Sequence, residues 1–189
     1  MAEFQVPSSG NDGYWIPTPG TFSNSGTYMC VGKNSSGYQN HIFARWTGIT
    51  IPPGAVITRA YVSLYQSTGN DGDPYAYLYF NKYGSPSAPT DAAAAEARAL
   101  TTNHVTWNLP DDAGWTNSPD ITDIINELIG LYGPYSSGSM LMLLRGLITA
   151  STSIYTAKSY DSDPALSPKL VIEWASAGGG AQIIGLSDI

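Results

Sequence analysis

The sequence predicts an all-β protein, a β-sandwich that carries one amphipathic helix and a short second helical segment. Charged residues make up only 12% of the chain, about half the usual share of ~25%, which excludes coiled coils and long-helix proteins. The chain holds 20 Gly, 13 Pro and 13 Tyr, a composition typical of many strands joined by turns. Several segments also show a period of two, with a mainly apolar set of side chains at every second position, as half-buried strands do.

The first half of the chain predicts a series of strands. Three short candidates are Glu3 to Val6, Gly13 to Ile16 and Thr27 to Lys33. Gln39 to Ile49 alternates, with Ile42, Ala44 and Trp46 on one side and His41, Phe43 and Arg45 on the other. Two prolines and Gly54 then end this strand, because proline lacks an N–H donor and glycine permits the turn.

Val56 to Ser67 is the clearest strand, with a small aliphatic core face at its even positions, from Val56 to Leu64. A turn at residues 69–74 leads to the strand Tyr75 to Lys82. We expect the two strands to pair as a hairpin across that turn. This pairing would place five tyrosines on one sheet face as a binding surface: Tyr61, Tyr65, Tyr75, Tyr77 and Tyr79.

Tyrosine offers apolar area, a hydroxyl and few rotatable bonds, so this face suits sugar stacking and protein contacts alike. The alternative is that the face packs against the chain's own N-terminal segment or helix.

Two segments predict helices. Asp91 to Arg98 is Ala-rich, with Asp91 as N-cap. Pro119 to Leu131 has Ser118 as a potential cap and proline at the first helical position. Its apolar stripe at helical spacing predicts an amphipathic helix that plugs one end of the sandwich; the stripe is Ile121, Ile124, Ile125, Leu128 and Ile129.

The last predicted strands are Ser139 to Leu147, Ser153 to Ser159 and Lys169 to Ala175. Met140 to Leu144 shows no alternation, so this segment is expected to be buried on both faces. The strands close a sandwich domain over residues 1–175, followed by a Gly-rich linker and a C-terminal segment at 176–189.

The C-terminal segment is unusually apolar. We expect it to act as an assembly arm that docks on a neighbouring subunit, for example by adding a strand to a sheet edge. The alternative is that it folds back on its own sandwich or stays mobile. The arm residues are Ile183, Ile184, Leu186 and Ile189.

No catalytic residue is predicted. His41 and His104 are the only histidines, and neither lies in a recognisable motif. Cys30 has no CxxC partner and is expected to be a small buried residue. The 15 acids leave carboxylate pairs open, but their separation cannot be read from sequence. The chain is therefore interpreted as a non-enzyme without a cofactor.

Two Asp-rich segments suggest calcium, although only weakly. Asn70 to Asp73 and Asp161 to Asp163 alternate oxygen ligands as calcium loops do. Neither continues to the distal Glu of an EF-hand, and Asp and Asn also cap plain turns. A turn is the favoured interpretation, and no metal ligand is assigned.

Charge and targeting patterns restrict the partners. The net charge is -7, and no cluster of Lys or Arg suits a nucleic acid. No apolar run is long enough to span a membrane. The first residues show no secretory signal, so we expect synthesis in a reducing cytoplasm.

Three stretches together resemble a known family: Phe43 to Leu64 around the Pro-Pro-Gly turn, Ser118 to Ile129, and Ser159 to Trp174. In this order and spacing they resemble DNRLRE-type domains. The resemblance implies a jelly-roll β-sandwich related to carbohydrate-binding modules, found in bacterial surface proteins and as short chains among tailed-phage virion proteins. The string that gives the family its name is not intact here, so no ligand site is carried over.

The resemblance, with the absence of a signal, implies a non-enzymatic structural protein on the exterior of a tailed-bacteriophage virion. A capsid decoration or cement protein fits best, and a tail-associated subunit belongs to the same class. Its partners would be other virion proteins or copies of itself. The alternative is a carbohydrate-binding or adhesin module that recognises host-surface glycans.

Overall fold

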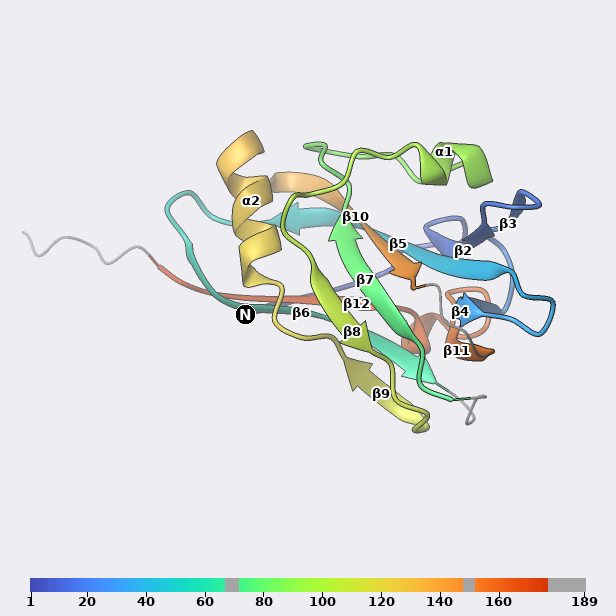
Figure 1. The fold of residues 1–189 in the computed structure, drawn as a ribbon. Coiled ribbons are helices and arrows are strands. Elements are labelled where there is room, and N and C mark those ends of the chain that lie inside the picture. Colours follow the sequence, from blue (N-terminus) through green and yellow to red (C-terminus); the bar gives the residue numbers. More distant parts are fainter. Residues whose placement is uncertain (67–71, 148–151, 177–189) are drawn as a thin grey trace, which may run out of the picture.

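The structure, a computed structural model, describes residues 1–66, 72–147 and 152–176. Two antiparallel sheets pack into a sandwich (Figure 1), which confirms the predicted all-β, jelly-roll-like fold. The small sheet has the order β1 (Ala2–Gln5), β12 (Lys169–Ala175), β6 (Val56–Gln66) and β9 (Gly114–Asn117). The large sheet has the order β11 (Ser153–Lys158), β4 (Tyr28–Lys33), β5 (Gln39–Thr50), β10 (Ser136–Gly146), β7 (Tyr75–Phe80) and β8 (Val105–Asn108), with β2 (Asp12–Ile16) on β5 and β3 (Thr21–Ser23) on β2.

The main core lies between the two sheets. The alternation predicted for the fifth strand is confirmed, because Ile42, Ala44 and Trp46 face this core. Partners from the small sheet include Val62, Leu64, Leu170 and Ile172, all fully buried. Each sheet therefore contributes one apolar face, as aligned sandwiches require.

The central strand β10 is buried on both faces, as its unbroken apolar run predicts. Met140, Met142 and Leu144 enter the main core. Leu141 and Leu143 enter a second apolar cluster on the outer side of the large sheet. A strand with two buried faces needs a cover on each, and the outer cover is helix α1 (Ala92–Glu96) (Figure 1).

The two predicted helices exist. The Asp91 carboxylate caps α1 by accepting a hydrogen bond from the Ala94 N–H at 2.7 Å, as predicted. Helix α2 (Thr122–Tyr132) stands at one end of the sandwich (Figure 1), with Ile124, Ile125 and Leu128 buried. Within the described residues, neither helix has the length and apolar character needed to cross a membrane.

The predicted start of α2 is wrong. The helix begins at Thr122 rather than Pro119, its N-cap residue is Ile121, and the Asp120 carboxylate accepts a hydrogen bond from the Thr122 N–H at 2.9 Å. The Ser118 hydroxyl instead accepts a hydrogen bond from the Val62 N–H at 3.0 Å, and an Asp120 oxygen accepts one from the Ala60 N–H at 3.3 Å. Ser118, the expected cap, thus satisfies a backbone donor of β6, and Asp120 serves both β6 and the first residue of the helix.

The predicted hairpin between β6 and β7 is also wrong. β6 pairs with β12 and β9 in the small sheet, whereas β7 pairs with β10 and β8 in the large one. The alternation along β6 also fails at its start: Val56 is 59% exposed and Ile57 is buried. A bulge in β6 causes this. Glu173 of β12 pairs with Arg59, but the next residue, Trp174, pairs with Ile57, so the pairing passes over Thr58.

Candidate functional site

The outer face of the large sheet brings together side chains that are far apart in sequence. The antiparallel registers place Trp15 opposite His41, His41 opposite Arg145, and Arg145 opposite Tyr77. Directly opposed residues on neighbouring strands project from the same face. Four strands therefore present one continuous row, and Tyr79 stands in the next row beside Leu143.

Glu96, at the end of α1, ties the helix to this row. Its Oε2 accepts a hydrogen bond from the Trp15 indole N–H at 3.0 Å, and its Oε1 lies 3.1 Å from Nη1 of Arg145. Arg145 Nη2 also donates to the Glu96 backbone oxygen at 2.9 Å. The guanidinium and the carboxylate thus neutralise each other at the surface, where Arg145 is partly buried and Glu96 is exposed.

A trough of about 590 Å³ opens beside this ion pair. It is lined by Pro17, Gln39, His41, Tyr77, Tyr79, Glu96, Leu100, Arg145, Gly146 and Leu147. Its volume and its mixture of apolar surface with a few polar groups are typical of small-ligand sites. We call this hollow the aromatic trough.

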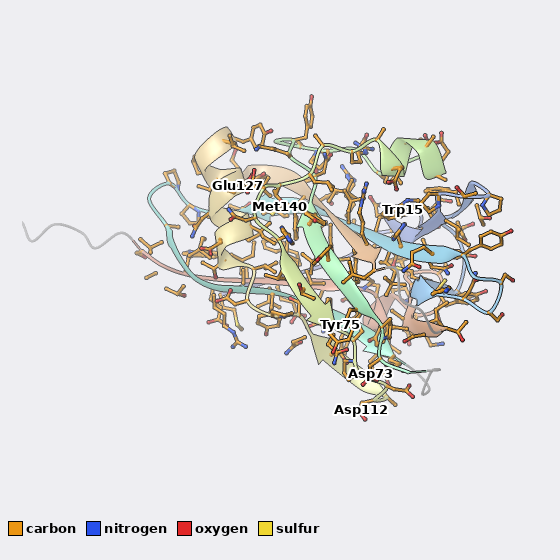
Figure 2. All side chains as sticks on the ribbon, in the orientation of Figure 1. Trp15, Asp73, Tyr75, Asp112, Glu127 and Met140 are labelled. Carbon is orange, nitrogen blue, oxygen red and sulfur yellow. The ribbon has the colours of Figure 1, made fainter. Side chains whose placement is uncertain are left out.

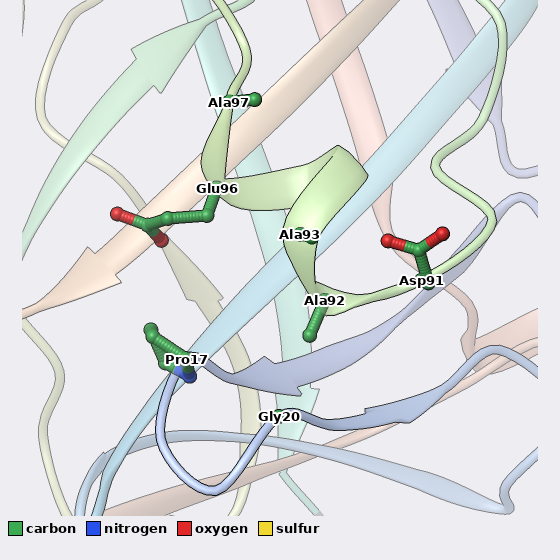
Figure 3. A pocket seen from close by; sticks show the side chains of 7 residues that line it. All are labelled: Pro17, Gly20, Asp91, Ala92, Ala93, Glu96 and Ala97. Atoms are coloured by element: carbon green, nitrogen blue, oxygen red, sulfur yellow. The ribbon is translucent and has the colours of Figure 1, made fainter.

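A second hollow, of about 610 Å³, shares Pro17 and Glu96 with the aromatic trough. Figure 3 shows it between α1 and the loop that carries Pro17 and Gly20. The two hollows therefore adjoin each other at Pro17 and Glu96.

Three rings form the aromatic wall beside the trough. His104 stacks on Tyr79 with ring centres 4.8 Å apart, and it meets Tyr77 edge-on at 5.0 Å. Tyr77 and Tyr79 lie edge to face at 6.1 Å. Burial and the neighbouring Tyr77 raise the pKa of Tyr79, so its hydroxyl remains protonated and can donate a hydrogen bond at neutral pH.

His41 lies at the floor of the trough in its neutral form. Its Nδ1 accepts a hydrogen bond from the Gly146 N–H at 3.0 Å. Burial, helped by Arg145 and opposed by Glu96, lowers the pKa of His41 to about 4. The ring therefore contributes no positive charge above mildly acidic pH.

The structure splits the predicted tyrosine face in two. Tyr61 and Tyr65 lie on the outer face of the small sheet, and Tyr75, Tyr77 and Tyr79 lie on the outer face of the large sheet. The single shared face is wrong because β6 and β7 do not pair. None of these rings is buried in the main core.

On the small sheet, Tyr65 is joined by Trp115, which sequence analysis missed. The two are cross-strand partners, with rings 5.4 Å apart in a T-shaped arrangement. Lys169 Nζ lies 4.6 Å from the Trp115 ring centre, and the Arg59 guanidinium lies 4.7 Å from that of Tyr61. The alternation in Gly114–Asn117 is the only signal for this strand, and four residues are too few to distinguish it from a turn.

In the described parts of the Asp-rich segments, two carboxylates accept backbone hydrogen bonds. Asp73 accepts from the Asp111 N–H and Asp163 from the Ala165 N–H, both at 2.9 Å. Across residues 1–66, 72–147 and 152–176, no group of three or more His, Cys, Asp or Glu residues could hold a metal ion. Asn70 and Asp71 lie outside the described residues, as do the arm residues Ile183, Ile184, Leu186 and Ile189.

Comparison with known proteins finds no matching family model and no matching curated protein. The two aromatic faces are the features of the described chain that suit binding.

Cys30 is predicted to be inert in the folded protein. It is buried, its Sγ lies 3.3 Å from the Asn40 side-chain oxygen, and burial raises the pKa of the thiol to about 12. Because only the thiolate attacks disulfides readily, Ellman's reagent should react slowly with the native chain at pH 8 and completely after unfolding in guanidinium. Rapid labelling of the native chain would contradict this environment.

Proposed function

We propose that this chain is a non-enzymatic structural subunit on the exterior of a tailed-bacteriophage virion, as a capsid decoration protein or a tail-associated subunit. The observation that carries the proposal is the outer face of the small sheet. It combines Tyr61, Tyr65 and Trp115 with the cations Arg59 and Lys169. Tyrosine, tryptophan and arginine are the residues most enriched at the centres of protein interfaces.

The surroundings of this face also suit contact with another protein. Glu3 forms an ion pair with Lys169 at 3.0 Å, and Glu173 lies opposite Arg59 on the neighbouring strand. Positive and negative charges thus alternate around the rings, as in a polar interface rim. The strand β9, which carries Trp115, ends the small sheet in the described chain, so its outer backbone groups are available for strand pairing.

The charge of the chain supports an exterior position. At -7, it has no electrostatic attraction to packaged nucleic acid, whose binding depends on clustered Lys and Arg. A surface subunit needs no such cluster.

Particle composition tests the proposal. Particles assembled with the full-length chain should contain it in a fixed ratio to the other virion proteins, measured by quantitative mass spectrometry. Trp115→Ala combined with Tyr61→Ala should reduce its occupancy at least tenfold, since loss of a central interface residue costs about 2 kcal/mol or more.

Tyr75→Ala is the matched control, because it removes an exposed tyrosine from the other sheet. Its occupancy should equal that of the unmodified chain. Absence of the unmodified chain from purified particles would refute the structural role. Normal occupancy of the double variant would refute the assignment of this face.

A second candidate function, glycan binding, is favoured by the aromatic trough. The trough lies on the large sheet, whereas the proposed protein-contact face lies on the small sheet. One subunit can therefore use both, one sheet to attach to the particle and the other to contact a cell surface.

A further inference from the structure

We infer that the aromatic trough binds a neutral pyranose unit of a glycan, with Tyr77 and Tyr79 as the stacking wall and the Arg145–Glu96 pair as the hydroxyl-binding group. The inference rests on the second candidate function and specifies its ligand class. It is carried by the juxtaposition of these four side chains around one hollow of about 590 Å³.

The tyrosine wall suits the apolar face of a sugar ring. Tyr77 and Tyr79 are only partly buried and hold each other edge to face. His104 packs against both rings from the side of β8. The wall is therefore pre-formed, so a ligand that stacks on it pays little entropy to order the side chains.

The ion pair supplies donors and acceptors together. A guanidinium only donates hydrogen bonds, and a carboxylate only accepts them. A sugar hydroxyl does both, so two neighbouring hydroxyls can bridge Arg145 and Glu96. Each charged group forms stronger hydrogen bonds than a neutral group in the same place.

The local charge selects against acidic sugars. Glu96 neutralises Arg145 at 3.1 Å, and His41 at the trough floor is uncharged at neutral pH. No unpaired cation is therefore among the residues that line the trough. A carboxylate on the ligand would lie near Glu96 without a free positive partner.

The position of the trough argues against an extended peptide as its ligand. Peptides that extend a sheet need free backbone groups at an edge, whereas the trough lies on the sheet face. Nearby backbone groups are already paired, as in the Leu147 N–H to Tyr75 oxygen bond of 2.8 Å. The hollow beside α1 adjoins the trough at Pro17 and Glu96, so a second linked sugar unit can reach it.

Calorimetric titration of the full chain tests the inference. The neutral probes are cellohexaose, maltohexaose and mannohexaose, and the acidic probe is the hyaluronan hexasaccharide. At least one neutral probe should bind, and it should bind at least tenfold more tightly than the acidic probe. Tyr77→Ala and Tyr79→Ala should each weaken that binding about tenfold or more, because the two rings lie at 76° to each other, so that one stacks on the sugar and the other holds it in place.

Tyr75→Ala is the matched control. It lies on the same strand and the same face, is 47% exposed, and is not among the trough residues. In Figure 2, Tyr75 lies close to Asp73 and away from Trp15. Its loss should change the affinity less than twofold, and thermal melting should show that all three variants are folded.

Glu96→Gln tests the charge argument separately. The glutamine oxygen can still accept from Trp15, but Arg145 loses its counter-charge. Affinity for the hyaluronan hexasaccharide should then rise about tenfold, through charge-assisted hydrogen bonds to the freed guanidinium. No rise would overturn the role of the ion pair.

The outcomes distinguish the neutral-pyranose inference from glycan binding in general. Binding of the acidic probe alone would overturn the neutral ligand class and leave glycan binding intact. Equal losses in Tyr75→Ala and Tyr77→Ala would overturn the trough as the site. Failure of all four probes to bind would overturn this inference, whereas binding of other glycans at the trough would still support the second candidate function. The particle experiment is independent of every result.

Discussion

Replacement of Trp46 by alanine should destabilise the chain by about 3–5 kcal/mol through the cavity it leaves, with about 1 kcal/mol more from a lost hydrogen bond. Trp46 is 0% exposed, and its ring stacks on Phe80 at 6.1 Å. Its indole N–H donates to the Pro168 oxygen at 3.0 Å. The residue thus links β5 of the large sheet to the segment that enters β12 of the small sheet.

The loss is mainly one of packing. The Pro168 oxygen keeps a second hydrogen bond, from the Val6 N–H at 3.1 Å, so the substitution leaves no buried acceptor without a partner. Since domains have a total stability of about 5–15 kcal/mol, Trp46→Ala should shift the urea midpoint strongly or prevent folding.

Trp115→Ala provides the matched control. It is the same substitution at a residue that is 41% exposed on the small sheet, where the ring contacts Tyr65 and Lys169 only at the surface. Its cost should be about 1 kcal/mol, because surface aromatic contacts contribute roughly 0.5–1.5 kcal/mol. Similar urea midpoints for the two variants would mean that Trp46 does not hold the sheets together.

The second large effect is a pair of opposed pH dependences, one from Asp12 and one from His41. Asp12 is 1% exposed. Its Oδ2 accepts from the Tyr160 N–H at 2.8 Å, while Oδ1 has no hydrogen-bond partner among the residues that the structure describes. Burial raises the pKa of Asp12 to about 7; the bond from Tyr160 opposes this and Asp161 adds to it. An acid with a raised pKa stabilises the fold below its unfolded value of about 4, and this stability is lost as pH rises to about 7.

His41 has the reverse dependence. Its pKa is lowered to about 4 by burial, with Glu96 opposing and Arg145 adding to the shift. The unfolded chain therefore gains a proton first as pH falls below about 6.5. The fold loses stability between about pH 6.5 and pH 4, so His41 offsets Asp12 over this range.

Removing either titrating group should leave the pH dependence of the other unopposed. Near pH 5.5, each contributes a slope of about 1.4 kcal/mol per pH unit to the free energy of unfolding. Asp12→Asn should therefore make the slope of the unfolding free energy against pH more positive than in the unmodified chain, by about 1.4 kcal/mol per pH unit. His41→Asn should make this slope more negative by a similar amount. The asparagine oxygen can replace Nδ1 as acceptor for the Gly146 N–H.

Urea unfolding at pH 4.5, 5.5 and 6.5 measures these slopes. Other carboxylates contribute equally to all three chains, so the comparison isolates the two groups. Parallel curves for the variants and the unmodified chain would show that neither residue is buried in the state described.

Sequence alone predicted much of the architecture, because strand periodicity is a local property. The strand Lys169–Ala175 has the predicted bounds, and the unbroken run Met140 to Leu144 lies between two apolar layers. The Asp91 cap and the apolar stripe of α2 were also correct. Each of these features depends on residues that are close together in the sequence.

The candidate sites were predicted only in part. Tyr77 and Tyr79 were identified from sequence, but Arg145, Glu96 and Trp15 were not, since they come from three elements separated by up to 130 residues. Trp115 was missed because its strand is only four residues long. An Arg or a Glu in a single sequence carries no sign that it will meet an aromatic wall.

The sequence by itself determined which side of β5 and of most of β6 faces the core, because side chains alternate with a period of two. It did not determine which strands pair, because alternation is the same whatever lies beside the strand. Only the tertiary structure placed β6 and β7 in different sheets and divided the tyrosines between two surfaces. The same packing brought Ser118 and Asp120 to the backbone of β6, and α2 begins after them, at Thr122. Long-range pairing thus decided both the helix boundary and the composition of each binding face.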